Sequence, residues 1–132
     1  MPGEWDANIK LLYAVDDGLF FTADTVEIGK PFDVIANVEI GENLMESVDS
    51  YDLYVSIHNL SQSTTLKQAK LSSALTPQKT TWNAELRVNI DPPFSNPAAE
   101  GDVLEAVATF KVTSGVNTDY STAKSPSFTV AT

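Results

Sequence analysis

The side chains best suited to holding a metal ion are carboxylates in two stretches of turn-like sequence. Asp24 and Glu27 lie in the first stretch, and Asp91, Glu100 and Asp102 lie in the second. Calcium is a hard cation that takes several oxygen ligands, so these acids could form a calcium site if the fold brings the two stretches together. No DxDxDG spacing is present, and scattered acids that solvate loops are the alternative.

The sequence has few of the side chains and motifs that enzymes use for catalysis. Cysteine is absent, which excludes disulfides, thiolate metal sites and thiol nucleophiles. The single histidine, His58, falls within an alternating stretch and has no nucleophile elbow or metal-ligand spacing around it. Asp16 and Asp17 fit a turn, where aspartates bond to nearby backbone amides. We therefore predict a protein that is not an enzyme and that binds no cofactor, calcium being the one candidate.

Exposed aromatic rings would offer a second kind of binding chemistry, the stacking of sugar rings. The candidates are Trp5, Tyr13, Tyr54 and Tyr120. Trp5 lies in a polar segment, and Tyr54 alternates with Leu53 and Val55, so it points away from them. Carbohydrate binding is thus an alternative function, and packing of these rings at an interface is the other reading.

Charge restricts the class of partner. The chain of 132 residues carries 8 basic and 18 acidic side chains, a formal charge of -10 at pH 7, which repels nucleic acid and anionic lipid. No window approaches the roughly 20 apolar residues of a membrane span, and no basic segment precedes the first short apolar stretch, as a secretory signal would require. We expect no nucleic-acid partner, no membrane insertion and, by default, a cytoplasmic location.

Strict alternation of apolar and polar residues is the main structural signal, and it predicts half-buried strands. It runs through residues 32–40, 51–58, 82–90 and 104–113, with a final strand at 127–130. Weaker strands fit residues 9–15, 19–26 and 64–71, and a trace of helical period covers 67–75. Seven to eight short strands separated by turns predict a single all-β domain over residues 1–132, a sandwich of two antiparallel sheets.

Three segments carry a family likeness: GKPF at residues 29–32, WNAEL at 82–86 and GDVLEA at 101–106. They resemble the B, E and F strands of bacterial immunoglobulin-like and fibronectin type III-like modules, and the resemblance covers nearly the whole chain. Where antibody-type domains have their two cysteines, this sequence has Ala36 or Val38 and Ala106, and Leu104 stands where the tyrosine corner would be. The resemblance implies an accessory or adhesion-like module, and its strand order would bring the five acids to one end.

The function that we predict first is protein interaction, through an exposed sheet face or edge strand, with another protein or a second copy of the chain. Ile35, Val103 and Val107 motivate it, because the alternation places these apolar residues on faces that are otherwise polar. Trp82 opens an alternating strand and is predicted to seal one end of the core. A calcium- or carbohydrate-binding accessory module is the alternative.

Overall fold

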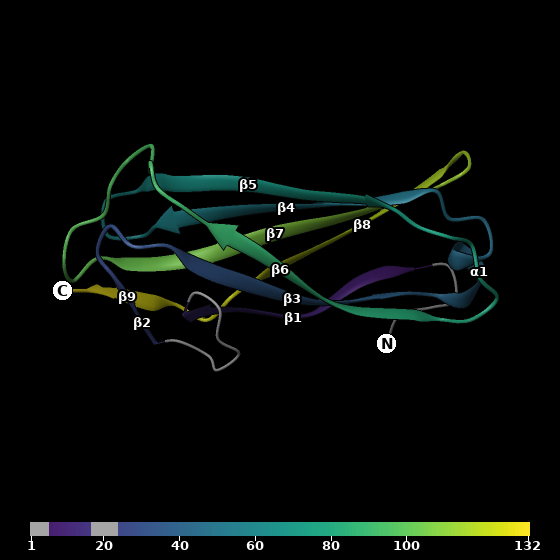
Figure 1. Ribbon diagram of the computed structural model, residues 1–132, viewed down its shortest axis with the longest axis horizontal. Coiled ribbons are helices and arrows are strands. Elements are labelled where there is room, and N and C mark those ends of the chain that lie inside the picture. Colours follow the sequence, from purple (N-terminus) through teal and green to yellow (C-terminus); the bar gives the residue numbers. More distant parts are fainter. Residues whose placement is uncertain (1–5, 17–23) are drawn as a thin grey trace.

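Strands form where the apolar and polar residues alternate, because that pattern gives each strand one face for the core and one for water. The computed structural model describes residues 6–16 and 24–132 (Figure 1). Within these ranges it has nine strands and one helical turn, in the following order: β1 Ala7–Asp16, β2 Thr25–Glu27, β3 Phe32–Ile40, α1 Glu42–Met45, β4 Ser50–Asn59, β5 Thr64–Ala74, β6 Trp82–Ile90, β7 Val103–Ser114, β8 Asn117–Lys124 and β9 Phe128–Ala131.

Two sheets face each other, which confirms the predicted immunoglobulin-like sandwich. One sheet has the order β1-β3-β6, and the other has the order β2-β9-β7-β4-β5, with β8 also paired to β7. The long β7 pairs with β9 near its start and with β8 over its second half. All pairs are antiparallel except β2 with β9, a short parallel pair at the edge of the larger sheet, so the sheets are mostly antiparallel, as predicted.

The core lies between the sheets and is built from the inward residues of the alternating strands. Leu53, Ile57 and Phe110 are among its largest fully buried side chains. Ala36, Val38 and Ala106 are buried in the same cluster and pack there as small apolar residues. Phe32 meets Phe128 edge to face, with ring centroids 5.5 Å apart.

Four local predictions need correction. Residues 67–75 are not helical, because β5 pairs with β4 along its whole length and its outward positions are polar. Residues 117–124, for which no strand was predicted, form β8, and the segment between the predicted strands 32–40 and 51–58 contains α1. Ile35 is fully buried, so it is not part of an exposed apolar patch; Val103 and Val107 are half-buried. Of the predicted strand at 19–26, residues 19–23 lie outside the described ranges.

The two long flanks of the sandwich differ. On one flank the β1 backbone is held by side chains of β8: Ala7 N donates to Asp119 Oδ2 at 2.6 Å, and Ile9 N donates to Ser121 Oγ at 3.0 Å. On the other flank β5 and β6 are the outer strands of their sheets. Side chains of β8 therefore bridge the first flank, called here the bridged flank. β5 and β6 border the second, called here the open flank.

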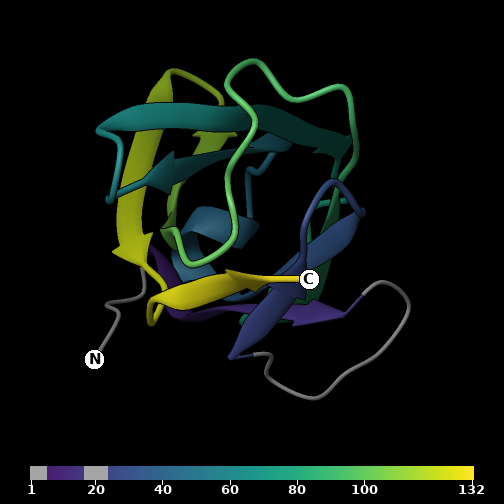
Figure 2. The ribbon, with the colours of Figure 1, turned by 90° about the vertical axis from the view of Figure 1, so that its left-hand side faces the viewer.

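The strands run along the long axis of the molecule, so it has two distinct ends (Figure 1). At the helix end, α1 follows β3 and Gly41 N donates to Asp6 O, next to the start of β1. At the loop end, the turn between β2 and β3 meets the end of β9, where Ile28 N donates to Ala131 O. Figure 2 shows the connection between β6 and β7 crossing this loop end.

Candidate functional site

The loop end brings together the two acidic stretches singled out in the sequence. β9 joins them, because Thr129 N donates to Asp24 O and Val130 N donates to Asp102 O, both at 2.9 Å. Asp91 directly follows β6, whose Ile90 pairs with Phe32 at the same end. Main-chain hydrogen bonds thus hold the two acidic stretches on either side of the short strand β9.

Asp102 is committed to structural hydrogen bonds. Its Oδ2 atom accepts from Gln62 Nε2 at 2.6 Å, from Asn59 Nδ2 at 2.8 Å and from Ala99 N at 2.9 Å. The Ala99 amide, and then the Asn59 side chain, hold the pKa of Asp102 below its usual value. Asn59 is only 1% exposed, so this cluster ties the start of β7 to the β4–β5 turn.

The other four acids do not gather around Asp102. Asp24, Glu27, Asp91 and Glu100 are exposed, and Glu100 Oε1 accepts a bond of 3.5 Å from Thr132 Oγ1. Within residues 6–16 and 24–132, no three acidic or histidine side chains lie close enough to hold a metal ion. The calcium site at these five residues stays a prediction.

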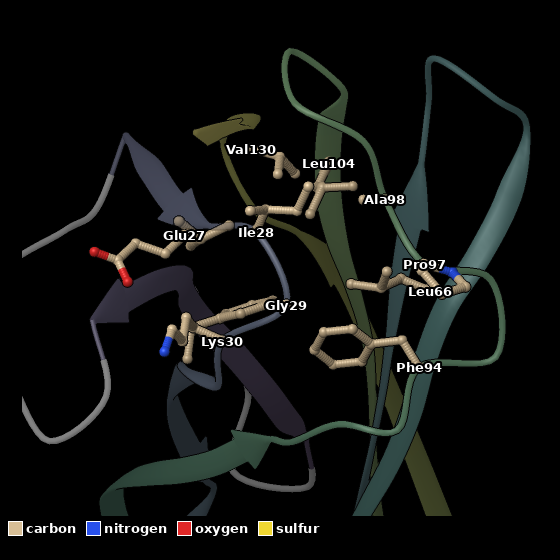
Figure 3. Close-up of a pocket in the computed structure, with 12 residues that line it drawn as sticks. Glu27, Ile28, Gly29, Lys30, Leu66, Phe94, Pro97, Ala98, Leu104 and Val130 are labelled. Carbon is tan, nitrogen blue, oxygen red and sulfur yellow. The ribbon is translucent and has the colours of Figure 1, made fainter. Parts of the chain in front are cut away.

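The loop end also contains a pocket that the sequence did not predict. This end pocket has a volume of about 200 Å³ and is drawn in Figure 3. Its lining comes from both sheets and both loops of the loop end: Val26, Glu27, Ile28, Gly29, Lys30, Phe32, Leu66, Phe94, Pro97, Ala98, Leu104 and Val130. It is a gap in the apolar core that opens at the end of the sandwich.

One wall of the end pocket is the tight turn from β2 to β3. Lys30 N donates to Glu27 O at 3.2 Å, and Gly29 takes a φ of 70°, which glycine adopts without the steric cost that a Cβ would bring. The turn is anchored to β9 through Ile28. The sequence GKPF therefore begins β3 and also shapes the mouth of the pocket.

The opposite wall is the first half of the connection between β6 and β7. Ser95 N donates to Leu66 O at 2.9 Å, and Asn96 Nδ2 donates to Thr65 O at 2.9 Å, so the loop lies along the start of β5. These bonds hold the half-buried Phe94 and Ala98 against the core. The only sequence signal for this wall was an apolar Phe in a loop rich in proline.

The end pocket has an apolar interior and a charged rim. In Figure 3 the carboxylate of Glu27 and the amine of Lys30 both point away from the centre, while Leu66, Phe94 and Leu104 surround it. No hydrogen-bonding side chain points into the centre among the residues drawn. The pocket can hold an apolar group, and its lining offers no acid–base pair.

The remaining candidates lie elsewhere. His58 is half-buried on the outer face of the six-stranded sheet, opposite Glu105 on β7. Tyr54 and Tyr120 share that face and are 40% and 60% exposed, Tyr13 is half-buried in β1, and Trp5 lies outside the described residues. Trp82 is half-buried and packs against the core, as predicted.

The fold places the chain in the class of immunoglobulin-like β-sandwiches. A β-glucuronidase of glycoside hydrolase family 2 has a similar domain, with a TM-score of 0.50 and 15% identity over 91% of this chain, which spans 12% of that enzyme. The CARDB domain of a Pyrococcus furiosus protein, solved in complex with di-metal ions, is similar at a TM-score of 0.48 and 19% identity, over 99% of this chain and 93% of that one. No family model and no curated protein matches the sequence.

The helical content of the structure is relevant to whether the chain could span a membrane. Across the described residues, no helix has the length and apolar character to cross a bilayer.

Proposed function

We propose that the chain is a non-catalytic protein-interaction module whose end pocket receives one apolar side chain of a partner protein. The observation that carries the proposal is the end pocket itself, an apolar hollow of about 200 Å³ at the exposed end of a rigid sandwich. Pockets for drug-sized ligands run from about 300 to 1,000 Å³, so this one fits a single large side chain better. Interface anchors of this kind supply most of the energy of many protein complexes.

The charge around the pocket favours a basic partner. Asp24, Asp91 and Glu100 are exposed at the loop end, together with Glu27 at the pocket rim. Lys67 Nζ, beside the loop wall, donates to Pro93 O at 3.2 Å. With a formal charge of -10, the chain attracts a cationic surface from a distance. The partner segment that fits is an apolar side chain flanked by lysine or arginine.

The side chains that line the end pocket are not arranged for catalysis. The pocket lining contains two titratable side chains, Glu27 and Lys30, and their charged groups point away from the hollow. His58 lies outside the lining, on the outer sheet face. An interaction role needs only shape, apolar area and charge, and all three are present at the loop end.

The direct test is a peptide titration followed by NMR. A blocked peptide Lys-Lys-Phe-Lys-Lys should shift the methyl signals of Leu66, Leu104 and Val130, while Lys-Lys-Gly-Lys-Lys and Glu-Glu-Phe-Glu-Glu should not. Ala98→Trp fills the pocket from its loop wall and should abolish these shifts, whereas Ala99→Trp, on the exposed neighbour, should leave them. Equal shifts with the glycine peptide, or an unaffected Ala98→Trp variant, would refute the proposal.

A second candidate function, carbohydrate binding, rests on the placement of two tyrosines. The register puts Tyr54 opposite Thr109, and Thr109 opposite Thr122, next to Tyr120 on β8. Strand spacing then separates the two tyrosines by about 12 Å on one face. A glycan array probes this face, and Tyr54→Ala combined with Tyr120→Ala should remove any hit; an array with no hits removes this candidate.

A further inference from the structure

The second half of β5 is an unprotected strand edge on the open flank of the sandwich. β5 ends the order of the six-stranded sheet, so one side of its backbone has no strand partner. Its first half is covered, because the loop after β6 bonds to the carbonyls of Thr65 and Leu66. Beyond these bonds, residues 68–74 have no backbone cover in the described structure. Unpaired strand edges are templates for pairing with another chain.

Side chains do not protect this edge either. Lys70, the single charge in residues 68–74, is drawn back over the sheet: its Nζ lies 3.8 Å from Asp52 Oδ1 and 5.2 Å from the centre of the Tyr54 ring. Ser72 Oγ donates to the same Asp52 carboxylate. The side chains of Lys70 and Ser72 therefore lean toward β4 and away from the free side of β5, which is the reverse of how edge lysines usually guard a strand.

The flank beside this edge is apolar. Ala69 and Leu71 of β5, and Trp82 and Ala84 of β6, are partly buried residues packed against the core along the open side. Their exposed parts face the gap between the outer strands of the two sheets. The bridged flank offers no such opening, because Asp119 and Ser121 occupy the β1 amides there.

We propose that residues 70–74 of β5 pair in antiparallel fashion with the same residues of a second copy, forming one continuous sheet across two molecules. A two-fold axis at Ser72 sets Ser72 opposite its own counterpart and Lys70 opposite Ala74 of the partner copy. Both contacts fit, because serine and alanine are small and Lys70 is already paired with Asp52. The same arrangement brings Leu71 of each copy beside the apolar flank of the other.

This dimer is expected to be weak and sensitive to salt. The five paired residues span about 17 Å and bury less area than the roughly 1,200 Å² of stable complexes, so we expect a dissociation constant of about 10 to 500 μM. Each copy carries a formal charge of -10, and the two repel each other. Raising the salt from about 0.05 to 0.5 M shortens the Debye length and should tighten the dimer several-fold.

The first experiment is sedimentation equilibrium of the chain up to about 1 mM at both salt concentrations. Amide hydrogen exchange adds the location: the amides within residues 70–74 should exchange more slowly as the protein concentration rises. A monomer at every concentration, or slowed exchange confined to other strands, would overturn the proposal.

Charge variants then test the register. Ser72→Lys and Ser72→Glu each place like charges opposite each other at the two-fold axis, so each alone should weaken the dimer at least tenfold. An equimolar mixture of the two should restore it as a heterodimer. Thr122→Lys, an exposed residue of β8 in the same sheet, is the matched control and should have little effect. If Thr122→Lys disrupts the dimer as much as Ser72→Lys, or the mixture stays monomeric, the β5 interface is wrong.

The pocket variants separate this inference from the proposed function. Ala98→Trp fills the end pocket without touching residues 68–74, so it should leave the dimerisation constant unchanged. Loss of the dimer in Ala98→Trp would assign self-association to the loop end and contradict the β5 interface.

Discussion

Tyr51 on β4 and Trp82 on β6 pack against each other across the sandwich, with ring centroids 5.7 Å apart and ring planes tilted by 36°. The pair joins the outer strand of the small sheet to β4, which lies next to the edge strand of the large one, and Tyr51 also contacts Phe110, with centroids 5.8 Å apart. Aromatic contacts of this kind add to the free energy of folding beyond the area that they bury. They close the core near the helix end.

Replacing Trp82 with alanine should lower the free energy of unfolding by about 2 kcal/mol. Full truncation of a buried tryptophan costs about 3 to 5 kcal/mol, and Trp82 is only half-buried. Urea denaturation measures the change. Tyr120→Ala, at a residue that is 60% exposed, is the control and should change stability by less than about 0.5 kcal/mol. An equal loss in both variants would argue against the Tyr51–Trp82 contact.

Alkaline stability should depend on Tyr51. Burial raises its pKa above 10.0, although a hydrogen bond with Ser73 acts in the opposite direction. The folded state therefore holds this proton more tightly than the unfolded state, so the stabilisation is complete below pH 10 and is lost as the pH rises through the folded pKa. Tyr51→Phe should show a shallower fall in melting temperature above pH 10. Parallel curves for the two proteins would exclude this contribution.

Acid stability should depend on Asp102 in the opposite sense. The Ala99 amide and the Asn59 side chain lower its pKa below 3.8, so the carboxylate stabilises the fold above that pH and the effect disappears as the solution becomes more acidic. Asp102→Asn should reduce the melting temperature at pH 6, and the gap from the parent protein should close by about pH 2. Thermal scans from pH 2 to 7 measure it, and a constant gap would contradict this assignment.

Leu66 links the end pocket to the core. It is fully buried, lines the pocket and sits in β5 where the pairing with β4 is irregular. Leu66→Ala should cost about 2 to 4 kcal/mol and enlarge the pocket. Leu60→Ala, at a residue that is 51% exposed, should cost less than about 0.5 kcal/mol. Denaturant titrations of both variants provide the measurement, and a small loss at Leu66 would mean that the site collapses.

Calcium has a direct test of its own. Because Asp102 Oδ2 already accepts three hydrogen bonds, and the other acids do not gather around it, we expect no heat on titration with calcium and no change in melting temperature. A binding heat that Asp102→Asn or Glu100→Gln removes would instead establish the predicted site.

The strands that sequence predicts well are those with one apolar face. Phe32–Ile40 and Trp82–Ile90 alternate cleanly, so their place in the core follows from a period of two. β8 has polar residues at most positions, and β5 becomes polar and exposed in its second half, so propensity alone leaves them ambiguous. Ile35 shows a further limit: alternation tells which face a side chain takes, and not whether that face is covered.

The end pocket was harder to predict, for a different reason. Its acidic surroundings could be read from the sequence, because an immunoglobulin-like order brings 24–27 and 91–102 to one end. Phe94 and Ala98 lie in a loop without periodicity, and their inward placement depends on the bonds of Ser95 and Asn96 to β5. Such contacts between a loop and a strand edge are set by tertiary structure.

The placement of β1 and β9 determines how tension applied through these two strands would act on the fold. β1 begins at the helix end, and β9 finishes at the loop end, so tension applied through these strands acts along the long axis of the molecule. The ladder bonds between β1 and β3 lie across that axis. A stretching force would load them together in shear instead of opening them one by one.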